Sequence, residues 1–421
     1  MNDNIKIIRG NIVGEKYKSG MEFSFELAIP MVNCDKYALL LEHDRLNDAN
    51  IKSMFQLAEE GNAPYCVNIG VAPGIQEISN GEKYNRRINT YDLFNSEYAD
   101  FVVYELIPHI EKEYEIKFYE NPDMHYVSGG SSGAISAFVI AWFHSEYFHR
   151  VYISSPSFLA MGRGNEIPYL IRKYETKPLK IYQEYSENEP NEYFGASYPI
   201  DIEAKMAFEY AGYDFYCEYF PNEGHCSRYR DLKTAYKRNK WIWNDYHTKP
   251  IVPQRNSSRI DAFIDINSKW EKVNNFPKKI VSEIKLNEKY STLVLSKDNQ
   301  FCYASNIDDE TVYSYIVKEK MEFNNRNTHA ILHTINGITP KGAIDMDVDV
   351  NDRLYVLTSI GIQCVRSFGL IDAILDLPKG KPLKICVTDS IFVMTDCGIY
   401  MRKLKSEYLE KNKRLCISYY D

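Results

Sequence analysis

Short apolar runs alternate with segments of helical periodicity through the first 248 residues. Residues 37–41 form a continuous apolar run of strand length, and residues 65–71 form the next strand-like run. Between them, residues 48–60 place Ile51, Met54, Phe55 and Ala58 on one helical face. Further strands are predicted at 5–8, 12–13, 21–29, 124–127, 150–154, 179–183 and 215–220, and further helices at 96–114, 134–142, 200–210 and 230–243. This alternation predicts a mostly parallel sheet with helices on both faces.

The pattern changes after a linker at residues 249–269, which contains Pro250, Pro253 and an Asn-Ser-Ser run. Residues 270–421 carry short strands separated by turns, as in an all-β domain. At about 40–50 residues for each propeller blade, such a segment makes about three blades. A closed propeller usually has at least four. We therefore expect an α/β domain at 1–248 and a partial β-propeller at 270–421.

Gly129-x-Ser131-x-Gly133 lies between a strand-like run at 124–127 and an apolar, helix-competent run at 134–142. A G-x-S-x-G motif between a strand and a helix is typical of the nucleophile elbow of an α/β-hydrolase. If Ser132 were the nucleophile, the last position would be Ala134 and the motif would break. We therefore predict Ser131 as the nucleophile and the Ser132 backbone amide as an oxyanion donor. The alternative is a Gly/Ser turn without chemistry.

A serine nucleophile needs a base, and in α/β-hydrolases the acid and then the histidine follow the serine in the chain. His225 fits best, because it follows the last predicted strand of this domain and precedes its last helix. His144 and His149 lie too near the elbow helix, and His247 lies at the linker. We therefore predict that His225 is the base.

The acid is expected in the loop after the strand at 179–183. That loop contains Glu184, Glu187, Glu189 and Glu192, and spacing alone does not choose among them. A second oxyanion amide is expected from the loop after Leu41, with Arg45 as the first choice.

Residues from about 37 to 246 resemble the enterochelin-esterase and feruloyl-esterase branch of α/β-hydrolases, often called esterase-D-like. The resemblance rests on the following segments: 127–133, 98–114, 211–213 and 223–225. Residues 187–195 resemble the acid loop of that branch, in which an aspartate usually stands where this chain has Glu189. The resemblance makes Glu189 the first choice of acid and Glu187 the second. It also implies carbohydrate, phenolic-acid or siderophore-type esters as substrates.

The chain departs from this branch at Arg45 and Ala134, where glycine is preferred. Arg45 could narrow the oxyanion loop or bind an anionic substrate, and it could equally be a surface arginine paired with a carboxylate. The departures at Glu189 and Arg45 permit an alternative in which the chain is a pseudoenzyme or binding module that keeps only the hydrolase fold.

The C-terminal part resembles the later half of gluconolactonase- and regucalcin-type propellers, through residues 342–349, 353–356 and 361–363. In that family acidic and amide side chains hold a divalent metal. Ile344 stands at the place of one acidic ligand, and Ser291 stands at the place of an asparagine ligand. We therefore expect no catalytic metal, no other cofactor and no lactonase site in the propeller. The remaining acidic cluster is expected to be exposed strand and turn carboxylates: Asp345, Asp347, Asp349 and Asp352.

A net charge of −8 with no basic stretch argues against a nucleic-acid partner. No apolar run is long enough to span a bilayer, and residues 1–8 lack the apolar core of a signal peptide. Nine cysteines without CxxC pairs favour reduced thiols and a cytoplasmic location.

Together these patterns predict a serine carboxylic-ester hydrolase that works through an acyl-enzyme on a small-molecule or glycan ester. An incomplete propeller leaves strand edges and apolar faces open, and such edges tend to pair with other chains. We therefore expect a homodimer through residues of about 285–405, or docking of that surface within the chain.

Overall fold

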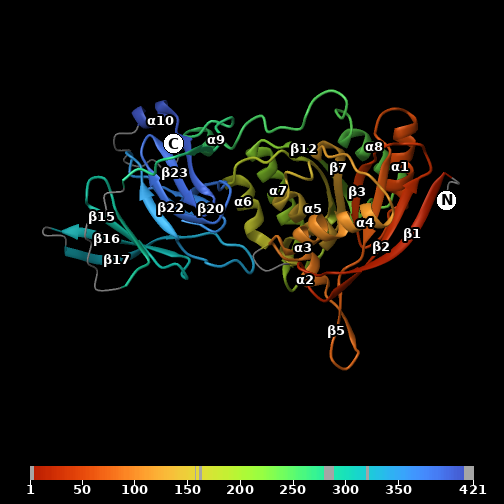
Figure 1. Cartoon of the computed structure of the whole chain (residues 1–421), viewed down its shortest axis with the longest axis horizontal. Coiled ribbons are helices and arrows are strands. Elements are labelled where there is room, and N and C mark those ends of the chain that lie inside the picture. Colours follow the sequence, from red (N-terminus) through yellow and green to blue (C-terminus); the bar gives the residue numbers. More distant parts are fainter. Residues whose placement is uncertain (1–3, 157, 161–163, 279–288, 319–321, 412–421) are drawn as a thin grey trace. The chain divides into compact units, whose positions relative to one another are not determined.

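A computed structural model describes residues 4–156, 158–160, 164–278, 289–318 and 322–411 (Figure 1). The chain divides into two compact units. Unit 1 comprises residues 1–169 and 177–253, and unit 2 comprises residues 170–176 and 254–421. Within the described ranges, no helix has the length and apolar character needed to cross a membrane.

Unit 1 is built on a ten-stranded sheet with the order β12-β9-β8-β7-β3-β4-β2-β5-β6, with β1 paired to β2. Its strands are β1 (Ile5–Val13), β2 (Met21–Pro30), β3 (Ala38–His43), β4 (Cys66–Val71), β5 (Ile75–Glu77), β6 (Lys83–Asn85), β7 (His125–Gly130), β8 (Arg150–Ser154), β9 (Lys180–Asn188) and β12 (Asp214–Gly224). The strands from β12 to β4 pair in parallel, and those from β4 outward pair antiparallel. A small hairpin, β10 (Asn191–Glu192) with β11 (Gly195–Ala196), stands apart. The predicted mostly parallel sheet is confirmed.

Helices cover both faces of this sheet, as Figure 1 shows. The helices of unit 1 are α1 (Asp48–Glu59), α2 (Arg87–Tyr91), α3 (Glu97–Phe101), α4 (Ile107–Glu113), α5 (Ser132–Phe143), α7 (Ser197–Ala211) and α8 (Leu232–Ile242), with short turns η2 (Pro122–Met124), η3 (Phe158–Ala160) and η4 (Gly164–Glu166). Helix α6 (Ile167–Lys173) begins in unit 1 and continues into unit 2. Helices α1 and α8 pack together over a core that includes Tyr126, Tyr152 and Tyr182. Helix α5 packs on β7 and β8, with Phe138 against Phe208 of α7. Covering both faces gives every central strand a buried setting.

Several predicted elements have different bounds in the structure, and two of these differences have a clear physical cause. The helix expected at 96–114 is broken by a π-helical turn, η1 (Val102–Leu106), directly before α4. Pro108 lacks an N–H to donate to the preceding turn, which explains the local change in hydrogen bonding. The strand expected to end at residue 183 continues as β9 to Asn188, because β12 pairs alongside it over most of that length.

Unit 2 contains three four-stranded antiparallel sheets. Its elements are α9 (Ser258–Asp261), β13 (Glu271–Val273), β14 (Thr292–Leu295), β15 (Phe301–Ser305), β16 (Thr311–Lys318), β17 (Glu322–Ile331), β18 (Asp345–Val348), β19 (Leu354–Thr358), β20 (Gly361–Val365), β21 (Ile371–Leu375), β22 (Pro382–Val387), β23 (Ser390–Thr395), β24 (Gly398–Lys403) and α10 (Ser406–Lys411). The sheets run β14-β15-β16-β17, β18-β19-β20-β21 and β13-β24-β23-β22. Strand β18 contacts both β14 and β22, so one edge strand of each sheet lies near an edge strand of the next.

Unit 2 also includes the short segment 170–176, which comes from the middle of the sequence of the first domain. Tyr174 forms a bridge with Ile374 and donates a hydrogen bond to the Ile360 carbonyl at 2.8 Å. Glu175 accepts two hydrogen bonds from the Arg402 guanidinium, at 2.6 and 2.7 Å. The sequence pattern gave no signal for this grouping, because the segment reads as part of an α/β alternation.

Candidate active site

Ser131 occupies the turn between β7 and α5, and Ser132 begins the helix. Ser131 has φ of 57° and ψ of −127°, a backbone conformation that residues with a side chain rarely adopt. Its amide donates a hydrogen bond to the Ser154 carbonyl at the end of β8, at 2.9 Å. Such strain persists only where surrounding contacts impose it, and it concentrates at functional sites.

The glycines on either side of Ser131 are needed because the chain is crowded there. A Cβ on Gly129 would lie 2.0 Å from the Gly133 carbonyl oxygen. A Cβ on Gly133 would lie 2.8 Å from the Cβ of His43 on β3. The sequence motif therefore has a steric cause in this fold: strand, helix and neighbouring strand meet too closely at the elbow for larger residues.

His225 and Glu189 contact each other across the ends of two parallel strands. His225 follows β12, Glu189 follows β9, and these strands are neighbours in the sheet. His225 Nδ1 lies 2.5 Å from Glu189 Oε2. The Glu189 side chain is fully buried, whereas 28% of the His225 side chain is exposed. A buried carboxylate can fix the tautomer and orientation of a histidine that remains accessible.

The two groups shift each other's pKa in opposite directions. Burial disfavours a charged imidazolium, but hydrogen bonds with Cys226 and Glu189 outweigh it and raise the pKa of His225 to about 10. Burial likewise disfavours the carboxylate, but hydrogen bonds from His225, Ser155 and Ser186 outweigh it and lower the pKa of Glu189. Both shifts favour the charged pair.

Ser155, which the sequence analysis did not single out, lies between the acid and the histidine loop. Its hydroxyl donates to Glu189 Oε1 at 2.6 Å and accepts from the Cys226 amide at 3.1 Å. Like Ser131, it has a positive φ, of 46°. Ser155 therefore holds the acid and the residue after His225 with one oxygen. Because Glu189 lies 34 positions further along the chain, no local sequence pattern reveals this contact.

The histidine loop adjoins the elbow. The Cys226 thiol donates to the Ser154 carbonyl at 3.5 Å, and the Ser131 amide donates to the same carbonyl. A Cβ on Gly130 would lie 3.2 Å from Cys226 Sγ. Gly130, the residue before Ser131, and Cys226, the residue after His225, therefore lie close together near the end of β8.

The structure places the other candidate acids elsewhere. Glu184 lies within β9, buried, and forms a salt bridge with the buried Arg238 at 3.2 Å. Glu187 accepts a hydrogen bond from the Asn222 amide at 2.7 Å. Glu192 is exposed in β10. Of the four loop carboxylates, Glu189 is the one that contacts His225.

The loop after β3 lies against the start of α5 at Asp44, the residue before Arg45. The Ser132 hydroxyl donates to Asp92 Oδ2 at 3.2 Å. Arg45 is exposed, one residue beyond Asp44, whose carboxylate would lie 3.7 Å from a Cβ on Gly133. Donors at a helix start can stabilise an oxyanion that forms at the neighbouring serine.

His43 anchors the loop after β3 as a neutral group. Its Nδ1 lies 2.9 Å from the Ser128 carbonyl oxygen, which can only accept, so Nδ1 carries the proton. Burial lowers the pKa of His43 to about 4. Neutral His43 therefore fixes this loop to β7 without placing a positive charge beneath the elbow.

Among the described residues, no group of three or more His, Cys, Asp or Glu side chains could hold a metal ion. The acidic cluster on and after β18 was expected to be exposed, and this expectation is wrong: Asp347 and Asp349 are buried, and Asp345 and Asp352 are half-buried. Asp347 accepts a hydrogen bond from the Val387 amide of β22 at 2.7 Å, and Asp349 accepts one from the Tyr408 hydroxyl at 2.7 Å. These carboxylates bond to backbone and side-chain donors of unit 2.

The fold, the strained serine at a G-x-S-x-G elbow and the histidine–glutamate contact define the class of α/β proteins to which esterases belong. A protein-family profile described as "Putative esterase" matches residues 37–283. The chain belongs to this esterase family. No curated protein sequence matches it.

Several solved structures are similar in fold. A ferulic acid esterase is 17% identical, with a TM-score of 0.44, over 57% of this chain and 98% of its own. Enterochelin esterase from Shigella flexneri is 15% identical, with a TM-score of 0.43, over 58% of this chain and 59% of its own. Siderophore hydrolase EstB from Aspergillus nidulans is 13% identical, with a TM-score of 0.41, over 58% of this chain and 96% of its own.

Proposed function

We propose that this chain is a serine carboxylic-ester hydrolase with Ser131 as nucleophile, His225 as base and Glu189 as the acid of the triad. The observation that carries the proposal is the 2.5 Å contact between His225 Nδ1 and Glu189 Oε2. Cys226, the residue after His225, lies against Gly130, the residue before Ser131. Family membership supports ester hydrolysis as the reaction class.

In the proposed mechanism, Ser131 Oγ attacks the ester carbonyl carbon and its proton passes to His225 Nε2. The backbone amides of Ser132 and Arg45 donate to the oxyanion. The tetrahedral intermediate collapses, and the alcohol leaves with the proton from His225. Water, deprotonated by His225, then attacks the acyl-enzyme and releases the acid and Ser131. Glu189 stays ionised throughout and stabilises the imidazolium.

As substrates we propose carbohydrate, phenolic-acid or siderophore-type esters, from the resemblance of residues 187–195 and 223–225 to the enterochelin- and feruloyl-esterase branch. A first test needs only a simple ester. Wild-type chain, Ser131→Ala and Ser132→Ala are assayed with p-nitrophenyl acetate, with folding checked by circular dichroism. Ser131→Ala should lose turnover, whereas Ser132→Ala should keep a measurable fraction because its backbone amide remains.

Equal loss in both folded variants would contradict the choice of Ser131. Wild-type chain that shows no turnover on a panel of acetyl, feruloyl and catecholate esters would instead favour the alternative, a pseudoenzyme or binding module. The pseudoenzyme alternative is worth testing because the chain departs from the branch at two positions, Arg45 and Glu189.

For the C-terminal part we propose a gluconolactonase-like partial propeller at residues 270–421, joined to the hydrolase domain at 1–248 by a linker at 249–269. The three four-stranded sheets, with β14, β18 and β22 lying together, support this arrangement. We further propose a homodimer in which two such halves form a ring of six sheets through residues of about 285–405, of which 285–288 and 319–321 lie outside the described residues.

Light scattering tests the dimer. The full chain should show twice its monomer mass of 49.0 kDa. A monomer mass that is unchanged on deletion of residues 260–421 would instead favour docking of the open sheets within one chain.

A cytoplasmic location is also proposed, and the free cysteines among the described residues are consistent with it.

A further inference from the structure

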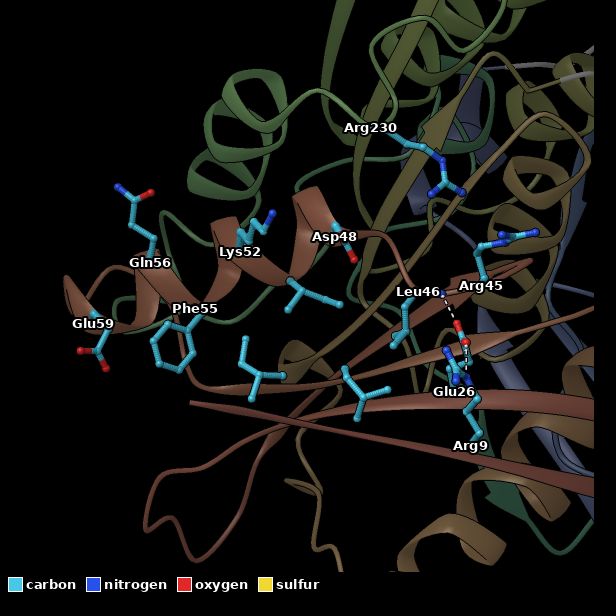
Figure 2. Close-up of a pocket in the computed structure, with 13 residues that line it drawn as sticks. Arg9, Glu26, Arg45, Leu46, Asp48, Lys52, Phe55, Gln56, Glu59 and Arg230 are labelled. Carbon is cyan, nitrogen blue, oxygen red and sulfur yellow. Dashed lines mark hydrogen bonds and ion pairs between the residues drawn. The ribbon is translucent and has the colours of Figure 1, made fainter. Parts of the chain in front are cut away.

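A cavity of about 620 Å³ in unit 1 is lined by residues of β1, β2, α1 and the loop before α1 (Figure 2). One wall is apolar and consists of Ile5, Ile7, Leu46, Ile51 and Phe55. Leu46 and Ile51 are buried, and Ile5 and Ile7 pack against them. Pockets that bind small molecules usually have volumes of about 300–1,000 Å³, so this cavity is of suitable size.

The cavity has a basic end. Figure 2 shows Arg45 and Arg230 at one end and Phe55 at the other. In the described part of the chain, neither Arg45 nor Arg230 forms a salt bridge, unlike Arg87 and Arg228, which each pair with a carboxylate. An arginine without a carboxylate partner can offer its planar fork of donors to an anion.

The lining contains four basic side chains and three acidic ones, so its net charge is positive. Glu26 is paired with Arg9 at 2.9 Å, and Glu59 accepts a hydrogen bond from the Tyr65 hydroxyl. Asp48 lies in the first turn of α1, where its charge complements the helix N-terminus.

The basic end adjoins the candidate active site. The Asn47 side chain donates to the Tyr229 carbonyl at 2.9 Å, which ties the loop of Arg45 to the residue before Arg230. The Tyr229 ring would lie 3.4 Å from a Cβ on Gly130, the residue directly before the proposed nucleophile Ser131. The two arginines therefore come from segments that adjoin the elbow, whereas the proposed triad residues do not line the cavity.

We propose that this cavity binds an amphipathic anion, with a carboxylate head group between Arg45 and Arg230 and an apolar chain or ring against the wall that ends at Phe55. The proposal that the cavity binds such an anion depends only on the shape and lining of the cavity. As the subsite that selects anionic, apolar substrates or retains the acid product, it rests on the proposed ester hydrolysis.

The test uses full-length Ser131→Ala, so that binding is measured without turnover. Isothermal titration compares octanoate with octanamide, which has the same tail and a neutral head group. Octanoate should bind at least tenfold more tightly, and Arg45→Gln combined with Arg230→Gln should remove that preference. Lys205→Gln, which removes a half-buried cation of α7 that does not line the cavity, is the control and should leave octanoate binding unchanged.

The apolar wall is tested by chain length and by Phe55→Ala. Butyrate should bind more weakly than octanoate, by up to about fourfold for each buried methylene removed. Phe55→Ala should weaken octanoate and octanamide alike. Both arginines are exposed, so the double variant should remain folded, which circular dichroism checks.

Equal affinity for octanoate and octanamide, or octanoate binding that is unaffected by the double variant, would overturn the proposal. Its failure is distinguishable from failure of the proposed function. Octanoate binding to Ser131→Ala with no esterase activity in the wild-type chain would leave the cavity assignment intact and reject the hydrolase. Esterase activity in the wild-type chain with no preference for octanoate over octanamide would support the hydrolase and reject the cavity assignment.

Discussion

Replacing Glu189 by glutamine should abolish most turnover while leaving the fold intact. Glu189 Oε1 accepts from the Ser155 hydroxyl at 2.6 Å and from the Ser186 amide at 3.0 Å, whereas Oε2 contacts His225. The glutamine oxygen should keep the two donors, so its NH₂ group would face Nδ1 of His225. Nδ1 must then accept, which places the proton on Nε2, the atom that has to receive the Ser131 proton.

The expected loss follows from this tautomer change. In the serine-protease triad, the corresponding amide substitution lowers kcat by about ten-thousand-fold, or about 5.5 kcal/mol of transition-state stabilisation. The assay is kcat and KM for p-nitrophenyl acetate with Glu189→Gln and with Glu187→Gln as the matched control. Glu187 contacts the Asn222 amide instead of His225, so its variant should retain activity. A Glu189→Gln variant that keeps a third or more of wild-type kcat would refute the reasoning.

The hydrogen bonds of His225 with Cys226 and Glu189 predict a pH dependence. A base must be neutral, and the pKa of His225 is raised from its ordinary 6.5 to about 10, so kcat/KM should keep rising above pH 8. Removal of the carboxylate should lower that apparent pKa in Glu189→Gln. The raised pKa also stabilises the fold below the ordinary pKa, and this contribution should be lost as pH rises toward 10. A wild-type profile that levels off near pH 6.5 would contradict the His225–Glu189 assignment.

Four further outcomes are expected. Gly129→Ala should destabilise unit 1 by roughly 3 kcal/mol or more in urea denaturation, because its Cβ would lie 2.0 Å from a backbone oxygen of the elbow helix. Ser155→Ala should lower kcat about 10- to 100-fold with little change in KM, because it removes a hydrogen bond to the charged Glu189; an unchanged pH profile would argue against that role. Glu175→Gln should destabilise unit 2 by about 3–5 kcal/mol, since it leaves the guanidinium of Arg402 buried without its ion pair. Esterase activity should not change on addition of EDTA, calcium or zinc; a loss with EDTA would contradict metal-independent catalysis.

The elbow could be predicted from the sequence because its requirements are local. Gly129, Ser131 and Gly133 lie within five positions, and the crowding at Gly129 arises within one strand, one turn and one helix, whereas that at Gly133 comes from His43 on β3. The α/β alternation likewise predicted the mostly parallel sheet. The bounds of β9 could not be predicted, because its last residues extend only through pairing with β12, a strand more than twenty residues further along.

The surroundings of the candidate triad were less accessible to sequence reasoning. Spacing left four carboxylates open, and the contact with His225 depends on where two separate loops meet. One weak sequence signal pointed to Ser155: it belongs to a pair of serines, Ser154 and Ser155, at the end of β8, the strand that pairs with β7. Asp347 and Asp349 read as exposed because acidic residues usually are, whereas hydrogen bonds from Val387 and Tyr408 permit their burial.

The most direct test of the central claim is covalent labelling of the nucleophile. Full-length chain is treated with an alkyl fluorophosphonate, digested and analysed by tandem mass spectrometry. The account predicts one phosphonate adduct on Ser131, absent from Ser131→Ala and strongly reduced in His225→Ala. An adduct on Ser132, or an unlabelled Ser131 in a chain that hydrolyses esters, would contradict it.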